Sequence, residues 1–592
     1  MRNNIRTIFY SSIALFSATM TSCEKQLNEY NPGGSTAEEI WTSPQGFVTA
    51  VNAAYVVQRE WYGKEDGIFM GETGTDLWFN REKNTYARQN TKYEGLSPVD
   101  GNPPKQTWMH LWRGINQCNA GIGRIDNAGF TDMVEKNKRL GELRFLRAFY
   151  YWHIVESWGG VMLRTKETDS VALHAKRSPV EDFYSLMIDD LLFAKDNLPI
   201  SWGAEYGRAS KKSAMGLLAR VYLSRAYYSP DGSADANSWF TKARDMAQEV
   251  ITKKAELQTD LWATPGELWN PANNKKNGEA NKESLYTITW SAKNLTANNQ
   301  PSGNVTHSTF LTLYSNKPGL TAAIEYGRDN SRRLMPTLFL LDLFDETKDA
   351  RYEASFQETW ASNAASPYAW NATDLTTYNK DASAVPAGTT IPAGSTALLI
   401  TKNVVADKKT RPYVVYDRND IYNVDGTIKT QSQSTHWVYP ALRKFIDLNR
   451  PAATPTADIG YNDIFVIRLA EMYMITAEAE HKLGNNQAAA DAINVLRTRA
   501  AKPGQAASFM VSAGDINTEF ILAERGREFC GEWMRWFDLK RMLKGQDFVD
   551  YIKTSNPDIT LVQDFHRLRP IPQVGEMDAL LNREEFGQNP GY

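Results

Sequence analysis

Aromatic side chains in segments without a helical pattern are the residues best suited to bind a ligand in this chain of 592 residues. Trp78 follows no helical stripe, and Asp76 stands beside it. An indole or phenol ring offers a flat apolar face for stacking on a ligand, and neighbouring amides or carboxylates can pair with the ligand's polar groups. We therefore predict a ligand-binding site from Asp76, Trp78, Tyr86, Trp290, Tyr314, Trp360, Tyr368 and Trp370. The alternative for each ring is packing inside the protein.

Catalytic motifs that a sequence can reveal are absent from this chain. It has no Gly-x-Ser-x-Gly, no His-Glu-x-x-His and no phosphate-binding loop ending in Gly-Lys-Ser or Gly-Lys-Thr. Its 69 acidic residues make carboxylate pairs too common to indicate a glycosidase. No run of alternating strands and helices predicts the barrel that often carries such chemistry. We therefore predict that the protein is not an enzyme.

Metal-binding patterns are weak. The seven histidines are scattered, and no two have metal-ligand spacing on one helix. Asp417, Asn419 and Asp425 loosely resemble a calcium loop, but the glycine stands at the wrong offset and no bidentate glutamate follows. We expect no cofactor, and structural calcium at this loop stays open as an alternative. Cys118 and Cys530 are far apart and form no metal motif, so we expect two buried free thiols.

The N-terminus has the pattern of an export signal. A basic start is followed by a short apolar stretch at residues 8–18 and then by Cys23. A cysteine at the expected cleavage point resembles the lipobox of bacterial lipoproteins. We predict a lipoprotein signal peptide over 1–22, lipidation at Cys23 and a lipidated tether over 23–42. No other segment has the apolar length of a membrane helix, so the protein is expected to be anchored to a membrane without crossing it.

The formal net charge of −3 argues against a nucleic-acid-binding protein, because such proteins usually carry a basic face. The hydrophobic content of 42% is sufficient for a sizeable core. We therefore expect a folded domain over residues 43–592 that has no nucleic acid partner.

Pairs of amphipathic helices are the main structural signal, and they predict a helical-repeat scaffold at about 43–253 and 463–592. The first helix is expected to start near Ser43. The clearest pair runs from Leu469 to Leu483, breaks at Gly484 and then restarts. Small residues at the crossing make this pair similar to a tetratricopeptide hairpin. The expected fold is therefore mostly α, with long irregular loops and a few short strands.

Other helix boundaries follow from capping signals. Residues 178–181 have capping-box spacing with Pro179 at the first helical position, and Asn237 or Ser238 is expected to cap a later helix. One long last helix is predicted over 515–543. It carries opposite charges at spacings of three and four, which predict a helix-to-helix ionic network. The members of this charge pattern are Glu524, Arg525, Arg527, Glu528, Glu532, Arg535, Asp538, Lys540 and Arg541.

The segment at about 254–462 differs in character from the scaffold. It is rich in Asn, Thr and Ala, and it has strand candidates at 285–290, 397–402 and 412–417. Long loops in a compact protein are usually functional or disordered. We predict that this segment is a variable insertion that faces the ligand.

Blocks of sequence spread over the whole chain resemble the SusD/RagB family. Glu38 to Tyr55 is similar to its first helix, and Glu142 to Val161 is similar to its Gly-rich block. Arg468 to Ala479 with Asn494 to Ala500 is similar to its C-terminal repeat. Further matching blocks are Trp112 to Asn119, Glu524 to Leu539, Pro570 to Gln573 and Gln588 to Tyr592. They occur in the family's order, and the middle of the chain matches least.

The resemblance implies a single SusD-like domain, lipid-anchored in the outer membrane of a Bacteroidetes-type bacterium and exposed at its surface. Family members act as a lid over a SusC-like TonB-dependent transporter, deliver oligosaccharides to it and have no known catalytic residues. The expected ligand is therefore a poly- or oligosaccharide. The alternative is a peptide- or glycoprotein-capturing lid of the same type of uptake system, since helical-repeat surfaces often bind peptides.

Overall fold

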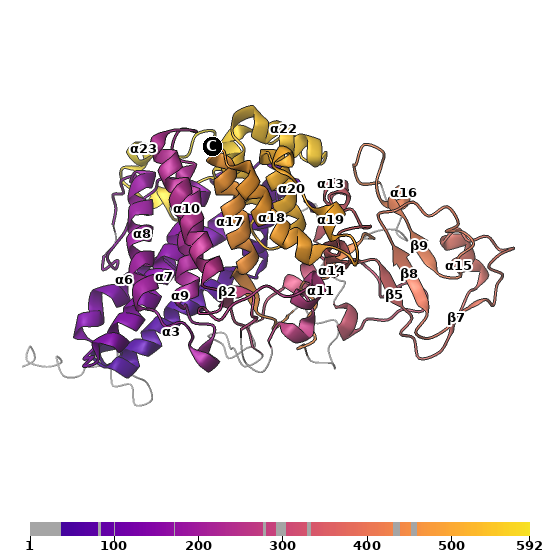
Figure 1. The fold of residues 1–592 in the computed structure, drawn as a ribbon, viewed down its shortest axis with the longest axis horizontal. Coiled ribbons are helices and arrows are strands. Elements are labelled where there is room, and N and C mark those ends of the chain that lie inside the picture. The colour runs from indigo at the N-terminus through magenta and orange to yellow at the C-terminus, as the bar shows by residue number, and fades with distance from the viewer. Residues whose placement is uncertain are drawn as a thin grey trace, which may run out of the picture.

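The computed structural model describes residues 37–80, 85–99, 101–170, 172–275, 280–291, 303–327, 333–429, 438–450 and 459–592. Helices dominate these residues, and the strands are few and short, so the predicted mostly α fold is confirmed. The helices gather in one bundle, and a smaller lobe that contains β5 to β9 projects from one side of it (Figure 1). The predicted signal segment 1–22 and the lipidation site Cys23 lie outside the described residues.

Amphipathic helices from the first part of the chain build one half of the bundle. The long ones are α3 (Pro44–Trp61), α6 (Pro104–Arg124), α7 (Met133–Trp158), α8 (Val180–Asn197), α9 (Lys211–Ala226) and α10 (Ala234–Thr252). The shorter ones are α2 (Ala37–Thr42), α4 (Glu65–Glu72) and α5 (Thr85–Lys92). The Ser43 hydroxyl accepts a hydrogen bond from the Gly46 amide at 3.1 Å, so α3 begins where the sequence predicts. α7 ends at Gly159, whose φ of 72° favours glycine.

The predicted tetratricopeptide-like hairpin is formed by α17 (Leu469–Lys482) and α18 (Asn486–Ala500). The turn between them uses Gly484 at a φ of 83°. α17 contacts both α10 and α18, so the hairpin continues the row of N-terminal helices (Figure 1). α20 (Thr518–Phe529), α21 (Arg535–Met542) and α22 (Gly545–Ser555) complete the bundle.

A short two-stranded ribbon joins segments that are distant in sequence. β2 (Ser284–Ile288) pairs antiparallel with β11 (Ile464–Arg468), and both strands are buried along their whole length. The predicted strand at 285–290 is therefore present. The scaffold thus extends into the range 254–462 that the sequence assigns to the insertion.

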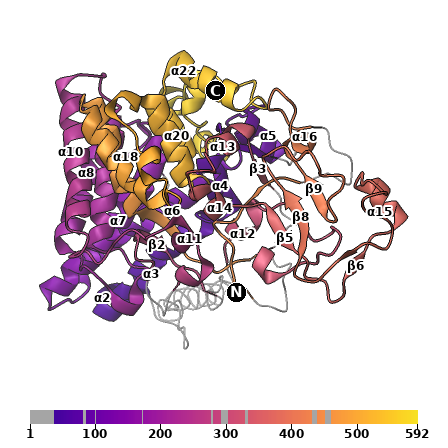
Figure 2. The same cartoon turned by 45° about the vertical axis from the view of Figure 1, so that its right-hand side comes forward.

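The smaller lobe is built around a three-stranded sheet in the order β5 (Thr359–Ala361), β8 (Thr396–Ile400) and β9 (Val414–Tyr416). β5 and β8 are antiparallel, whereas β8 and β9 are parallel. The predicted strands at 397–402 and 412–417 correspond to β8 and β9. The elements next to this sheet are β6 (Tyr368–Ala369), β7 (Thr390–Ile391), α15 (Ala372–Thr377) and α16 (Arg418–Ile421) (Figures 1 and 2).

Short elements connect the lobe to the bundle. β1 (Trp78–Asn80) pairs with β3 (Leu334–Pro336), and β4 (Phe356–Gln357) pairs with β10 (Ala441–Leu442). The remaining one-turn helices are α11 (Pro265–Leu268), α12 (Thr306–Thr309), α13 (Leu338–Asp342), α14 (Arg351–Ser355), α19 (Ala506–Phe509) and α23 (Arg583–Phe586).

Two helix starts and one linker differ from prediction. α8 begins one residue later than expected, so Pro179 is its N-cap, and no side chain caps this helix. α10 begins earlier than expected, because the Ser233 hydroxyl accepts a hydrogen bond from the Ala236 amide at 3.1 Å and replaces 237–238 as the cap. α2 lies inside the range 23–42 that is predicted as a tether.

The predicted continuous last helix over 515–543 is wrong. The chain leaves helical geometry between α20 and α21, where Gly531 has a φ of 79° and Trp533 a φ of 63°. Residues with positive φ cannot continue a right-handed helix. The charged residues of the pattern lie on both sides of this break, and those of the two helices still come together in one cluster.

The predicted ionic network is confirmed, and it is buried. Arg468 pairs with Glu528 at 2.7 Å and with Glu532 at 2.7 Å, and Arg351 pairs with Glu524 at 2.9 Å. Each of these side chains is almost inaccessible to solvent. Each charge faces a partner of opposite sign, as burial of ionised groups requires.

Candidate functional site

Most of the predicted ligand-binding aromatic residues are inside the protein. Trp78 is 0% exposed, and Trp290, Tyr314, Trp360 and Trp370 are each 1% exposed. A ring face that already packs against protein atoms cannot stack on a sugar without rearrangement. For these residues the structure therefore favours the packing alternative.

Trp78 and Asp76 link the N-terminal loops to the C-terminal helices. The Trp78 indole donates a hydrogen bond to Glu72 Oε2 at 2.6 Å. Arg535 Nε donates to the Asp76 carboxylate at 2.8 Å, and Asp76 is 0% exposed. Both side chains therefore stabilise the fold, and the prediction that they face a ligand needs correction.

The other predicted aromatic residues fall into separate pairs. Tyr314 stacks on Trp360 with ring centroids 6.4 Å apart, and Tyr368 meets Trp370 edge to face at 6.2 Å. The Trp370 indole donates to the Pro412 carbonyl at 2.9 Å. Tyr368 is half-buried, and its hydroxyl bonds to Asp374. Tyr86 belongs to α5, and its side chain lies outside the described residues.

Trp290 is the predicted residue that lines a cavity of appreciable size. The cavity holds about 560 Å³ and is bordered by Asn52 and Arg59 of α3, by Tyr206, and by Lys275. Asn52, Val56 and Arg59 lie at helical spacing, so they share one face of α3. The loop between α8 and α9 supplies Tyr206, and Trp290 follows β2.

A second cavity of about 460 Å³ adjoins the first and shares Tyr206 and Arg208 with it. It is lined by Trp202, Lys212 and Lys282. We call the two cavities together the Trp290 cleft.

Half-buried aromatic rings border the cleft. The Trp202 indole donates to the Ala209 carbonyl at 2.7 Å, and the Tyr206 hydroxyl donates to Asp463 Oδ2 at 2.7 Å. These bonds fix the rings, while part of each ring stays accessible to solvent. Neither residue is among the predicted site residues, although Trp202 between Ser201 and Gly203, and Tyr206 before Gly207, are aromatic residues in a loop between helices, which is an available signal.

The cations in the cleft differ in whether their partners are charged or neutral. Arg208 pairs with Glu142 at 2.9 Å, and Lys275 pairs with Asp463 at 3.0 Å. Arg59 instead donates from Nε to the Thr289 carbonyl at 2.8 Å and from Nη2 to the Thr289 hydroxyl at 3.1 Å. Burial lowers the pKa of Arg59 from its ordinary value, and attraction to the Asp463 carboxylate partly opposes this fall.

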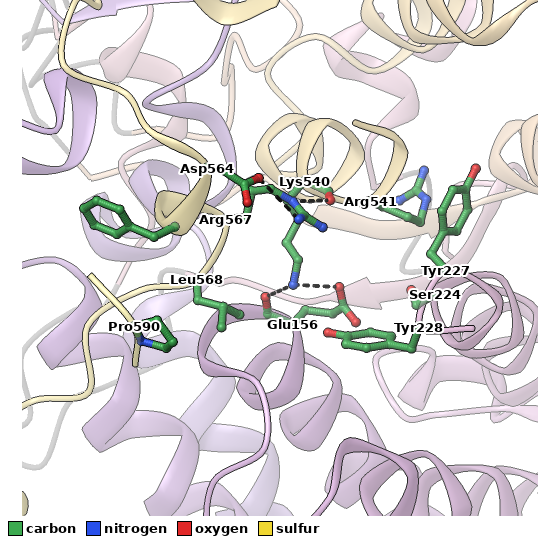
Figure 3. Close-up of a pocket in the computed structure, with 11 residues that line it drawn as sticks. Glu156, Ser224, Tyr227, Tyr228, Lys540, Arg541, Asp564, Arg567, Leu568 and Pro590 are labelled. Atoms are coloured by element: carbon green, nitrogen blue, oxygen red, sulfur yellow. Dashed lines mark hydrogen bonds and ion pairs between the residues drawn. The ribbon is translucent and has the colours of Figure 1, made fainter. Parts of the chain in front are cut away.

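A cavity of about 350 Å³ beside α21 offers a contrast, because its charges neutralise one another. Lys540 lies 3.3 Å from Glu156, and Arg567 lies 3.4 Å from Asp564. Figure 3 shows the Lys540 side chain extended toward Glu156, and Arg567 next to Asp564. Arg541, on the same lining, bonds to Glu478 at 2.8 Å. We call this cavity the Lys540 pocket, and its pairing indicates a structural role.

The candidate calcium loop already holds a cation. Lys408 Nζ lies 2.9 Å from Asp417, whose carboxylate also accepts a hydrogen bond from the Asn419 amide at 3.1 Å and caps α16. In the described part of the chain, no cluster of His, Cys, Asp and Glu is arranged to hold a metal. Cys118 and Cys530 are buried free thiols, as predicted. Among the described helices, none has the length and apolar character needed to cross a membrane.

Comparison with known proteins gives matches to two family models. The model of the SusD family matches residues 265–592, and a model described as starch-binding associating with outer membrane matches residues 53–223. SusD-like protein P25 of Formosa agariphila is 24% identical over 592 aligned positions, which cover 96% of this chain and 97% of that protein.

Solved structures share the fold. A SusD homolog from Bacteroides thetaiotaomicron superposes with a TM-score of 0.70 at 20% identity, covering 94% of this chain and 99% of that one. A laminarin-binding SusD-like protein superposes with a TM-score of 0.62 at 20% identity, covering 93% of this chain and 100% of that one.

Proposed function

The chain belongs to the SusD family, and from this premise we propose that it captures a poly- or oligosaccharide at the cell surface and delivers it to a SusC-like TonB-dependent transporter. The matched model described as starch-binding and the laminarin-binding neighbour support a saccharide ligand. The protein is proposed to act by binding alone, without catalysis.

The observation that carries this proposal is the Trp290 cleft. Trp202 and Tyr206 present partly accessible rings, and Asn52 and Thr289 add amide and hydroxyl groups at the same cavities. Rings for the apolar face and polar groups for the hydroxyl rim are the two requirements of saccharide binding. The Lys540 pocket also has rings, from Tyr227 and Tyr228, but its Lys540 and Arg567 are paired with carboxylates of the same lining, Glu156 and Asp564.

The proposed place of action is the outer membrane, with lipid on Cys23. The export pattern of residues 1–22 and the outer-membrane description of the matched family model support it. A lipid anchor would hold the cleft near the transporter without a membrane-spanning helix. The proposed partners are therefore the transporter, the saccharide and the membrane through the anchor.

Native gel electrophoresis of residues 24–592 through a panel of polysaccharides tests the proposal. We expect at least one polymer to retard the protein and Trp202→Ala to abolish most of the retardation. Trp239→Ala is the matched control, because Trp239 is also a half-buried indole, and it bonds to Asp235 at 3.0 Å on α10.

Each other outcome removes a defined part of the proposal. Retardation that survives Trp202→Ala would move the site away from the cleft. A protein that no glycan retards, and that instead recovers peptides from a digest, would replace the saccharide by a peptide ligand.

A further inference from the structure

The charges that line the Trp290 cleft are strongly unbalanced. Among the described side chains that line it, one is a carboxylate, Glu205, and five are cations: Arg59, Arg208, Lys212, Lys275 and Lys282. The protein as a whole has a net charge of −3, so this excess is local. Clefts lined by one sign of charge concentrate ligands of the opposite sign.

Internal ion pairs account for only part of this excess. Lys275 is paired with Asp463, and Arg208 is paired with Glu142 and Glu205. Among the described residues, no carboxylate lies within ion-pair distance of Arg59, Lys212 or Lys282. Arg59 and Lys212 therefore remain available to a ligand, whereas the Lys282 ammonium lies 4.4 Å from the centroid of the Trp262 ring.

Arg59 is held in position for an anion. Its Nε and Nη2 atoms bond to neutral oxygens of Thr289 at 2.8 and 3.1 Å, which fixes the plane of the guanidinium at the cavity wall. No acceptor for its Nη1 atom is found among the described residues. Guanidinium groups bind carboxylate and sulfate oxygens through short charge-assisted hydrogen bonds.

Lys212 has a similar environment in the second cavity. Its ammonium group donates to the Gln258 carbonyl at 3.1 Å, and burial lowers its pKa to about 8. It also stands in the first turn of α9, where the helix dipole disfavours a cation. An anion bound beside Lys212 would offset both the cost of burying its charge and its unfavourable interaction with the helix dipole.

We propose that the Trp290 cleft selects saccharides that carry carboxylate or sulfate groups, with Arg59 and Lys212 each contacting an anionic group. This inference rests on the proposed function and names its substrate class. The two cavities adjoin, so one oligosaccharide with charges on neighbouring sugars can contact both cations. Trp202 and Tyr206 then serve the apolar faces of the same sugars.

Matched ligand pairs test the inference on residues 24–592. The probes are polygalacturonate with its methyl-esterified form, and a sulfated galactan with its desulfated form. We expect calorimetry to show binding of at least one charged polymer that is at least about tenfold tighter than that of its neutral form. Whether the uronate or the sulfate pair shows this difference identifies the anion.

Protein variants make the test specific to the site. Arg59→Gln and Lys212→Gln should each weaken binding of the charged polymer by about tenfold and leave the neutral form unaffected. Lys380→Gln is the matched control, because burial also lowers the pKa of Lys380 to about 8 and its ammonium group bonds to the Lys408 carbonyl at 2.9 Å. Thermal unfolding of each variant checks that the fold is intact.

The outcomes separate this inference from the function on which it rests. Equal binding of charged and neutral forms, with loss of binding in Trp202→Ala, would overturn the anionic class and leave saccharide capture standing. Absence of binding to every glycan would overturn both. Equal losses in Lys380→Gln would show that the effect does not come from the cleft.

Discussion

The ionic network and the Trp290 cleft use the same types of residue in opposite ways. In the network, Arg468 lies 2.7 Å from Glu528 and is itself buried among carboxylates. In the cleft, Arg59 bonds only to neutral oxygens. A cation whose charge is satisfied inside the protein fixes the packing of helices, whereas a cation without a counter-charge at a cavity wall can recruit one from a ligand.

The Lys540 pocket shows that a cavity alone does not indicate a binding site. Its lining includes charged side chains, yet Lys540 and Glu156 pair with each other. It therefore resembles the network more than it resembles the cleft. Pairing of the lining charges is what distinguishes the two kinds of cavity.

The largest expected effect comes from breaking the network. Glu528→Gln removes a charge that Arg468, Arg499 and Arg351 share, leaving three buried guanidinium groups with one counter-charge fewer. We expect a loss of about 3–5 kcal/mol in the free energy of unfolding, measured by urea denaturation.

Two further variants are expected to change the free energy of unfolding much less. Glu584→Gln, at an exposed position of α23, should change the free energy of unfolding by less than about 0.5 kcal/mol. Arg59→Gln should fall close to this control, because it breaks no ion pair. A loss in Arg59→Gln as large as that in Glu528→Gln would erase the distinction between the network and the cleft.

The next largest expected effect is a pH dependence of the free energy of unfolding. Its sign is opposite for two buried carboxyl groups. Burial raises the pKa of Glu72 to about 8, although hydrogen bonds from Trp78 and Gly531 oppose the rise. Burial acts in the same direction on Glu528, but Arg499, Arg468 and Arg351 outweigh it and hold the pKa of Glu528 well below its ordinary value.

The sign follows from proton uptake. Between its unfolded pKa and about 8, Glu72 is protonated in the folded state and ionised in the unfolded state, so its contribution to stability falls as pH rises. We expect wild type to lose on the order of 3 kcal/mol relative to Glu72→Gln between pH 5 and 9. Glu528 is ionised in the folded state, so its contribution is lost as pH falls below its unfolded pKa.

Urea denaturation at a series of pH values measures both trends. The difference between wild type and Glu72→Gln should change steadily across neutral pH, while that between wild type and Glu528→Gln should stay constant there and shrink in acid. A pH-independent difference for Glu72→Gln would mean that Glu72 is ionised at neutral pH in the folded protein.

The sequence predicts the network and the helix pairs because these depend on local spacing. Gly484 between two small-residue stripes indicates the α17/α18 hairpin, and Ser43 before Pro44 indicates the start of α3. Charges at spacings of three and four indicate ionic faces even where Gly531 and Trp533 interrupt the helix.

The site was harder to predict, because exposure depends on contacts between distant segments. Trp78 is buried since β1 pairs with β3, which lies far along the chain, and since Glu72 accepts its indole hydrogen bond. Trp202 remains partly accessible in a loop between two helices. Both tryptophans stand outside helical stripes, so periodicity cannot distinguish them. The sequence also does not reveal which groups Arg59 bonds to, because its hydrogen-bond partner Thr289 directly follows β2, far along the chain.

The smallest expected effect comes from removing a negative charge from the cleft. Glu205 is exposed and pairs with Arg208 three residues later, and such surface pairs contribute about 0–1 kcal/mol to stability. Glu205→Gln removes the carboxylate that lines the cleft and frees part of Arg208. We expect affinity for the charged polymer to rise about two- to threefold, because repulsion of the ligand is removed while the fold is unchanged. Titration calorimetry at low ionic strength measures this gain, which added salt should diminish.

Glu249→Gln is the control, since Glu249 also pairs with a cation a few residues later, Lys253 at 2.8 Å, but does not line the cleft. If Glu205→Gln weakened binding, the carboxylate would have to act as a partner of sugar hydroxyl groups, and the cleft would then recognise a neutral ligand in spite of its excess of cations.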